Sequence, residues 1–138
     1  MVRTTITLYV EGAGSVDSLA ADEGSGLIYW VDRQKRIINL ASMLHQLRTS
    51  LPTGNMTRPH AIALDVTQRS LYISQIDTPP TIERCLQDGH DCTTVVTQRL
   101  VRPDTLTVSR DHLYWTDSGS GDISALNIHT HSVTHYAV

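Results

Sequence analysis

Short apolar segments separated by polar and turn-forming residues recur along the chain and predict a protein made of β-strands. Residues 61–65, AIALD, are almost all apolar, which is typical of a strand buried on both faces of its sheet. Residues 113–117, LYWTD, are aromatic and β-branched and end at an aspartate before a Ser/Gly turn. No helical spacing of apolar residues extends beyond about a dozen residues, so the pattern favours an all-β fold.

Three kinds of segment recur in the same order and indicate an internal repeat. Each copy has an aromatic segment whose tyrosines are 43 and 42 residues apart: Tyr29, Tyr72 and Tyr114. An apolar segment precedes each tyrosine and ends at Asp22, Asp65 and Ser109. A third segment follows each tyrosine at 36–40, 81–86 and 122–128, and a β-branched run closes the copy. Four strands in about 43 residues is the period of a β-propeller blade.

One segment has the spacing of an amphipathic helical turn and competes with this interpretation. Its leucines lie at i, i+4, i+7 and i+11: Leu40, Leu44, Leu47 and Leu51. The corresponding segments of the other two copies are strand-like. We therefore expect the third and fourth strands of the first blade here, with strand one of the three blades starting near residues 16, 60 and 103.

The tetrapeptide Tyr114-Trp115-Thr116-Asp117 is interpreted as architecture and not as a reactive site. Successive side chains of a strand point to opposite faces, so Tyr114 and Thr116 should face one neighbouring blade and Trp115 and Asp117 the other. The aspartate can accept backbone N–H bonds where the strand ends. A catalytic site would need a base beside a nucleophile, and none recurs nearby. The residues assigned to this structural motif are Tyr29, Trp30, Asp32, Tyr72, Tyr114, Trp115, Thr116 and Asp117.

The repeat resembles the YWTD β-propeller, formed by the class B repeats of the low-density lipoprotein receptor family. YWTD at 114–117 and YWVD at 29–32 carry the resemblance, together with RPHAIALD at 58–65 and the hairpin at 82–92. The middle copy departs from the motif with YISQ at 72–75, which is expected to weaken its packing between blades.

The family propeller has six blades, which at this period needs about 260 residues, whereas the chain has 138. We therefore expect a fragment, or an incomplete gene product, that forms one partial propeller over 1–138. It should contain an orphan strand at 4–10 and blades at about 11–53, 54–97 and 98–138. The open flanks of such a half-ring would be apolar.

Two cysteines and one N-glycosylation sequon indicate in which cellular compartment the protein folds. Cys85 and Cys92 flank an Asp-Gly turn and are directly opposed across the predicted hairpin, within reach of a disulfide. That bridge would imply an oxidising compartment, and two free thiols are the alternative. Asn55-Met56-Thr57 is an N-glycosylation sequon in a Gly/Pro-rich loop, and it gains weight from the cysteine pair and the resemblance.

The composition argues against a nucleic-acid partner and a membrane helix, and the histidines raise the question of a metal site. A net charge of −3 without a basic cluster gives no reason to expect a nucleic-acid partner, and no apolar run is long enough for a membrane helix. The start of the chain lacks the apolar stretch of a secretory signal. His129, His131 and His135 cluster near the C-terminus; a metal site is one interpretation and a solvated turn with an edge strand is the preferred one. We expect no cofactor.

The resemblance implies protein ligands on one face of the propeller, formed by the loops after strand two and before strand one. The candidate residues on this face are Arg33, Lys35, Arg58, His60, Asp77, Arg102, Asp104 and Asp122. The expected protein is a non-catalytic module of a single-pass endocytic receptor with EGF-like neighbours, at the cell surface and in endosomes. A secreted matrix or signalling co-receptor scaffold is the alternative. A calcium-dependent propeller lactonase or esterase is a more distant alternative. The inward-facing ends of the first strands offer Asp17, His60 and Asp104, which do not form the repeated set of acids and amides that such an enzyme needs.

Overall fold

A computed structural model describes residues 12–45 and 47–137 as three antiparallel sheets of four strands each. The first sheet contains β1 (Val16–Asp22), β2 (Leu27–Asp32), β3 (Ile37–Ser42) and β4 (Arg48–Ser50). The second contains β5 (Pro59–Asp65), β6 (Ser70–Gln75), β7 (Thr81–Leu86) and β8 (Thr93–Val96). The third contains β9 (Pro103–Ser109), β10 (His112–Asp117), β11 (Asp122–Asn127) and β12 (Val133–Ala137). The predicted starts of the first strand of each sheet are confirmed.

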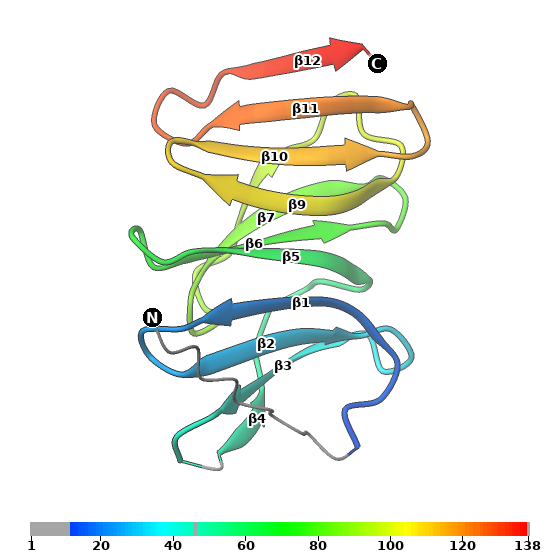
Figure 1. Cartoon of the computed structure of the whole chain (residues 1–138). Helices are drawn as coiled ribbons and strands as arrows, with labels where there is room; N and C mark the ends of the chain where they lie inside the picture. Colours follow the sequence, from blue (N-terminus) through cyan, green and yellow to red (C-terminus); the bar gives the residue numbers. More distant parts are fainter. Residues whose placement is uncertain (1–11, 46, 138) are drawn as a thin grey trace, which may run out of the picture.

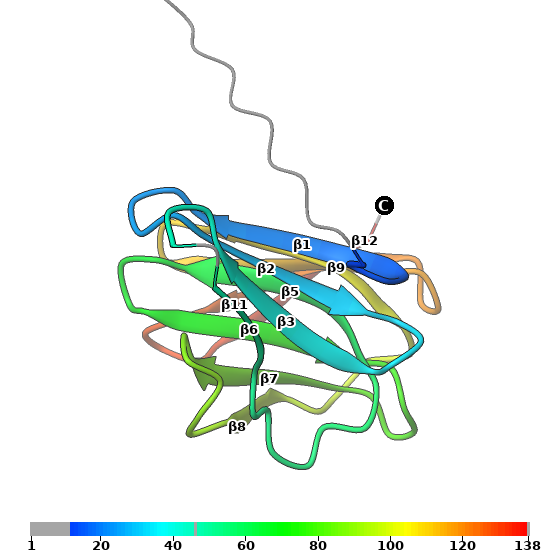
Figure 2. The same ribbon diagram turned by 90° about the horizontal axis from the view of Figure 1, so that it is seen from below.

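The three sheets are arranged as neighbouring blades of a propeller. The first strands, β1, β5 and β9, lie side by side, and each sheet extends outward from its first strand in sequence order (Figure 1). Seen from below, the middle blade runs from β5 down to its outer strand β8 (Figure 2). The predicted all-β propeller with about three blades is therefore confirmed.

The leucine-rich segment at 40–51 forms strands and not a helix, as expected from the repeat. Leu40 lies in β3, and Leu51 is buried directly after β4. Leu44 and Leu47 lie in the turn between these strands, and they are 70% and 60% exposed. The helical spacing arose because two leucines of the turn fall between Leu40, a partly buried residue of β3, and the buried Leu51 that follows β4.

Apolar side chains fill the wedge on each side of the middle blade. Tyr29 and Val31 of β2 pack against Ile62, Leu71 and Ile73 of the second blade. On its other side, the second blade packs against the third through a cluster whose largest fully buried members are Tyr72, Ile82, Leu113, Trp115 and Leu126. The side chains of β6 point alternately into these two wedges, which explains why this strand is the most buried of the chain.

The aromatic residues of the repeated motif point to opposite sides of their blade. Tyr29 and Tyr72 face the blade that follows and are buried there. Trp115 is 1% exposed because it faces the second blade, whereas Tyr114 is 37% exposed on the outer side of the third blade. The prediction that neighbouring residues of this strand face different sides is confirmed.

Trp30 differs from the expectation of an exposed apolar flank, because its side chain is only 2% exposed. The indole Nε1–H donates to the carbonyl of Ala13 at 3.0 Å. The guanidinium carbon of Arg48 lies 5.2 Å from the centroid of the ring, in cation–π contact. The chain thus covers this tryptophan with its own residues, and a pattern of apolar positions could not reveal either contact.

The orphan strand expected at 4–10 falls outside the described residues. The blade limits proposed from the repeat stay a prediction, although the sheets span 16–50, 59–96 and 103–137. The middle blade contains a cis peptide bond between Thr78 and Pro79 in the loop after β6.

The outer side of the third blade leads to a prediction of self-association. Tyr114, Ile123 and Tyr136 lie on β10, β11 and β12 and are at least 37% exposed. Contiguous apolar surface and open strand edges favour association. We expect the 138-residue chain, made alone, to form dimers or larger species by light scattering. Tyr114→Ser together with Tyr136→Ser should shift the mass toward the monomer, and a monodisperse monomer of the unaltered chain would contradict the prediction.

Candidate functional site

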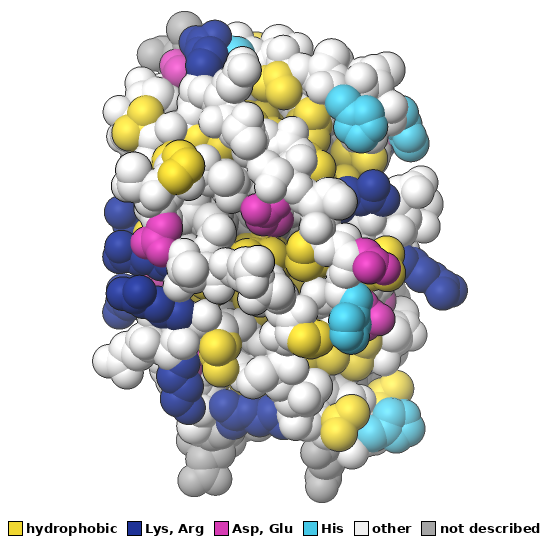
Figure 3. All heavy atoms as spheres, turned by 180° about the vertical axis from the view of Figure 1, so that it is seen from behind, with side chains coloured by type: hydrophobic (Ala, Val, Ile, Leu, Met, Phe, Trp, Pro, Cys, Tyr) yellow, Lys and Arg dark blue, Asp and Glu magenta, His cyan; other side chains and the backbone are white. Residues whose placement is uncertain are grey.

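The ends of the second strands and the starts of the first strands gather at one end of the three blades, here named the top face. It consists of the turns 33–36, 76–80 and 118–121 and of the segments that lead into β5 and β9. Figure 3, which views the molecule from behind, shows most of the visible lysine and arginine side chains along its left edge, where these turns lie. A repeated backbone bond builds this face, from the N–H of Arg33, Ile76 and Ser118 to the carbonyl of Ser15, Arg58 and Arg102.

A chain of ion pairs crosses the top face and connects all three blades. His60 lies between two carboxylates, with Nδ1 3.4 Å from Asp17 and Nε2 3.3 Å from Asp104. Arg33 lies 3.5 Å from Asp17, and Arg102 lies 3.0 Å from Asp104. The two aspartates and the histidine occupy the second position of β1, β5 and β9, so the repeat itself places them side by side. His60 is only 17% exposed, which keeps this contact out of bulk solvent.

Three arginines surround a hollow beside this ion chain. The hollow has a volume of about 70 Å³, and it is lined by Asp17, Arg33, Arg58, Pro59, His60, Ile76 and Arg102. Arg33 and Arg102 each have one aspartate partner. No hydrogen bond or ion pair within the described part of the chain engages the guanidinium of Arg58, which is exposed. With His60 neutral, the three arginines therefore carry one positive charge more than Asp17 in the hollow and Asp104 beside it balance.

The ionisation of Asp104 fits this role as a partner of cations. Its partial burial opposes the charged form, but hydrogen bonds from Ser118 and Arg102 outweigh that effect. The positive charge of Arg102 acts in the same direction, as does His60 when it is protonated, and together these contacts hold the pKa of Asp104 below its ordinary value. Asp104 is thus ionised at neutral pH, and the positive surplus of the hollow comes from Arg58.

Asp117, the last residue of the tetrapeptide motif, ties the top face of the third blade together. Its carboxylate accepts the N–H groups of Val101 at 2.8 Å and Arg102 at 2.9 Å, before β9. It also accepts those of Gly119 at 2.9 Å and Ser120 at 3.0 Å, after β10. Burial opposes ionisation, but these four N–H groups outweigh it and hold the pKa of Asp117 below its ordinary value of 3.8.

Gln75 takes over part of this role in the middle blade, where the motif reads YISQ. Its Oε1 accepts the N–H of Thr57 at 2.6 Å and of Arg58 at 2.8 Å, which precede β5 as Val101 and Arg102 precede β9. Asp77 accepts the hydroxyl of Thr57 from the other side. The longer glutamine therefore preserves the link between this loop and the strand. Ile73 is fully buried in the tryptophan position, so the wedge there is filled.

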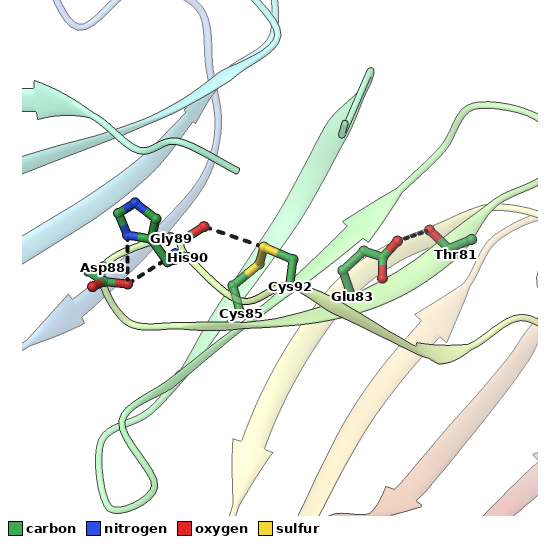
Figure 4. Close-up of a disulfide and its surroundings, with 7 residues drawn as sticks. All are labelled: Thr81, Glu83, Cys85, Asp88, Gly89, His90 and Cys92. Atoms are coloured by element: carbon green, nitrogen blue, oxygen red, sulfur yellow. Dashed lines mark hydrogen bonds and ion pairs between the residues drawn. A yellow bond between two sulfur atoms is a disulfide. The ribbon is translucent and has the colours of Figure 1, made fainter. Parts of the chain in front are cut away.

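A disulfide joins Cys85 and Cys92 across the β7–β8 hairpin, at the end of the blade opposite the top face (Figure 4). The turn between them places Asp88 against His90, whose N–H donates to the carboxylate at 3.0 Å. That hydrogen bond is the main reason why the pKa of Asp88 lies below its ordinary value. Cys85 is buried among the residues between the first two blades, so the bridge anchors the hairpin to the core.

Loss of this bridge should destabilise the chain without changing its fold. We expect Cys85→Ser with Cys92→Ser to lower the free energy of unfolding by about 2–3 kcal/mol, because the bridge closes a short loop. Urea unfolding of the secreted chain measures the change, and Ser120→Ala, in an exposed turn of the third blade, is the control that should leave the free energy of unfolding unchanged. Peptide mass spectrometry of the unreduced chain should show the linked pair, and two alkylatable thiols would contradict the assignment.

The sequon lies beside a cleft of about 440 Å³ between the loop before β5 and the β7–β8 hairpin. Asn55 is exposed at the edge of this cleft, and its neighbour Met56 packs against the core. The N–H of Thr57, the third residue of the sequon, is bound to Gln75. An asparagine on an exposed loop of this kind is accessible to a glycosyltransferase.

Two of the three histidines near the C-terminus have separate side-chain partners. His129 Nε2 lies 3.0 Å from Asp111, and His135 Nδ1 lies 2.7 Å from the hydroxyl of Ser124. Across residues 12–45 and 47–137, no three His, Cys, Asp or Glu side chains are grouped so that they could hold a metal ion. In the same residues, no helix is long and apolar enough to cross a membrane.

The structure brings together five of the eight residues predicted for the ligand face: Arg33, Arg58, His60, Arg102 and Asp104. Lys35, Asp77 and Asp122 lie at this end but outside the hollow. Sequence reasoning did not assign Asp17 to the face, although it occupies the same repeat position as His60 and Asp104. Sequence reasoning used that shared position only when a catalytic set was considered, and did not extend it to the ligand face.

Comparisons with known sequences give relatives that include a vitellogenin receptor. No protein-family model matches the chain. Protein cueball of Drosophila yakuba is 32% identical over 122 residues, which is 83% of this chain and 19% of that protein. Vitellogenin receptor Yl of Drosophila melanogaster is 31% identical over 110 residues, which is 78% of this chain and 5% of that protein. The chain therefore spans a fifth or less of the length of these relatives.

Comparisons with solved structures give β-propellers. A chain of the nidogen/laminin complex has a TM-score of 0.62 at 18% identity, over 93% of this chain and 65% of that one. U3-55K has a TM-score of 0.75 at 15% identity, over 94% and 41%. Virginiamycin B lyase from Staphylococcus aureus has a TM-score of 0.68 at 17% identity, over 94% and 43%. At these identities the likeness concerns the fold alone.

The repeated four-stranded blades and these likenesses define the chain as part of a β-propeller. Its YWTD and YWVD motifs and its similarity to protein cueball and a vitellogenin receptor define the class of β-propeller more narrowly. The chain belongs to the YWTD β-propellers of the low-density lipoprotein receptor family.

Proposed function

We propose that the chain is an extracellular module that binds protein ligands on its top face, within an endocytic receptor related to lipoprotein receptors. The observation that carries this proposal is the convergence of Arg33, Arg58 and Arg102 from separate loops on one hollow of that face. Charged groups that are partly exposed and held by a rigid scaffold are typical of a binding surface. The similarity to a vitellogenin receptor supports a secreted protein as the ligand.

We propose no chemistry for this site. A propeller lactonase would need carboxylates and amides that converge on a free cation site at the first strands. The groups present there are Asp17, His60 and Asp104, and they are paired with one another and with arginines. These ion pairs indicate that the three residues hold the loops of the top face in place.

A scaffold role in the extracellular matrix is the second candidate, favoured by the likeness to a chain of the nidogen/laminin complex. Uptake distinguishes the two roles. Cells that express the full-length protein should internalise fluorescent vitellogenin if the protein is an endocytic receptor. Surface-bound vitellogenin that is never internalised would favour the scaffold.

Binding of purified vitellogenin to the immobilised chain by surface plasmon resonance tests the face itself. Arg33→Gln with Arg102→Gln should weaken binding at least about tenfold, because both arginines lie at the top face. Arg69→Gln with Arg110→Gln, in the turns at the opposite end, is the matched control and should leave binding unchanged. Equal losses in both pairs would place the ligand elsewhere.

We propose that Asn55 carries an N-linked glycan when the chain is secreted. The expected result is a single glycoform whose mobility in gel electrophoresis increases after treatment with peptide N-glycosidase F. Asn55→Gln should abolish the shift, whereas Asn127→Gln, at an asparagine outside any sequon, should retain it. An unaltered mobility of the secreted chain after digestion would refute the assignment.

A further inference from the structure

We propose that the hollow on the top face binds the carboxylate of one aspartate or glutamate side chain of a protein ligand, with Arg58 as its ion-pair partner. This inference rests on the proposed protein-binding function and adds the chemistry of the group that is recognised. It follows from the partners of the three arginines, from the size of the hollow and from the acidic residues around it.

The partners of the arginines single out Arg58. Arg33 and Arg102 are neutralised by Asp17 and Asp104, which His60 holds in place. Arg58 lines the same hollow, and its guanidinium has no hydrogen bond or ion pair among the described residues. A guanidinium presents paired N–H donors that match the two oxygens of a carboxylate. An incoming carboxylate would therefore complete the charge balance of the hollow.

The size and walls of the hollow favour a single side chain. Its volume of about 70 Å³ leaves room for little more than one small polar group. Pro59 and Ile76 form apolar walls beside the arginines, which suits the methylene groups that carry a carboxylate. The backbone of Arg58 is fixed on both sides, because its N–H donates to Gln75 and its carbonyl accepts from Ile76.

The surrounding charges argue against a polyanion such as a sulfated polysaccharide. Asp77 and Asp122 lie on the same face, outside the hollow, and add negative charge to its surroundings. A chain of closely spaced sulfates would meet these carboxylates, whereas one acidic side chain among neutral or basic neighbours would not. The observations therefore favour a peptide segment with one acidic residue at its centre.

Selection of displayed peptides tests the proposal without knowledge of the natural ligand. A phage library of random 12-residue peptides is selected on the unaltered chain after depletion on the Arg58→Gln variant. We expect the enriched peptides to share one aspartate or glutamate. A synthetic peptide of that sequence should lose about tenfold in affinity by fluorescence anisotropy when this residue becomes asparagine or glutamine. It should lose a similar factor when Arg58 becomes glutamine.

Arg99→Gln is the matched control, because Arg99 is an exposed arginine in the segment before β9 that does not line the hollow. Its affinity for the peptide should equal that of the unaltered chain. Enriched peptides without a shared acidic residue that still depend on Arg33 or Arg102 would overturn this inference and leave the proposed function standing. Peptides indifferent to every top-face variant would count against both.

Heparin, a sulfated polysaccharide, tests whether the hollow binds a polyanion instead of one acidic side chain. It should compete weakly with the acidic peptide, and its binding should fall steeply with salt. Heparin that binds through Arg58 more tightly than any selected peptide, or a selection that enriches no peptide, would overturn the proposal.

Discussion

Trp115→Ala is expected to lower the free energy of unfolding of the 138-residue chain by about 3–5 kcal/mol. The indole is 1% exposed and belongs to the cluster that joins the second and third blades. Its removal would leave a cavity bounded by residues of two sheets, such as Tyr72 and Leu126, which cannot both relax into it. Urea unfolding followed by circular dichroism measures the change.

The adjacent Tyr114→Ala is the matched control, since it removes another aromatic side chain from the same strand. Tyr114 is 37% exposed on the outer side of the third blade, and we expect a loss of about 1 kcal/mol or less. Equal losses at the two positions would mean that Trp115 is not the contact that joins the blades.

Asp117→Ala should have the second largest effect, about 3 kcal/mol, because four backbone N–H groups would lose a charged acceptor at a buried position. Asp122→Ala is its control. Asp122 lies directly opposite Asp117 in the sheet and accepts no hydrogen bond through its side chain within the described structure, so its loss should stay below about 1 kcal/mol.

Acidic pH should destabilise the folded chain partly through the carboxylate of Asp117. The pKa of Asp117 in the folded chain lies below the ordinary value of 3.8, so its contribution is complete above that pH. The contribution is lost as the pH falls through the folded pKa, where the carboxyl takes up a proton. We therefore expect the unaltered chain to lose stability below about pH 4 more steeply than Asp117→Asn. Parallel curves for the two chains in that range would contradict this account.

The sequence predicted the fold well because the repeat supplies the same information three times. Periodic tyrosines and apolar segments located the first and second strands, and they also rejected a helix at 40–51. The repeat could not show what covers Trp30, because it locates strands and loops but not which side chain of β4 or which carbonyl before β1 reaches the indole. The compensating bond from Thr57 to Gln75 was missed because YISQ was interpreted only as a weaker motif, without asking whether glutamine could replace the aspartate as an acceptor.

The site was predicted less completely, because proximity on the top face depends on the angle between blades. Loop positions identified the arginines and His60 as residues of one face, but not that His60 bridges two aspartates. The equivalent repeat positions did group Asp17, His60 and Asp104 at the first strands in advance, but the repeat alone could not show that the three side chains pair with one another. The unpartnered state of Arg58 follows from side-chain distances, which the repeat does not contain.

Each sheet is built from four strands that are consecutive in the chain, and no strand is exchanged between sheets in the described residues. A tandem duplication or an in-frame deletion of one repeat in the gene would thus add or remove a complete blade. The ladders of the remaining blades would stay intact, and only the interfaces between neighbours would have to adapt. Recombination can therefore change the number of blades that the gene encodes, while every encoded blade keeps all four of its strands.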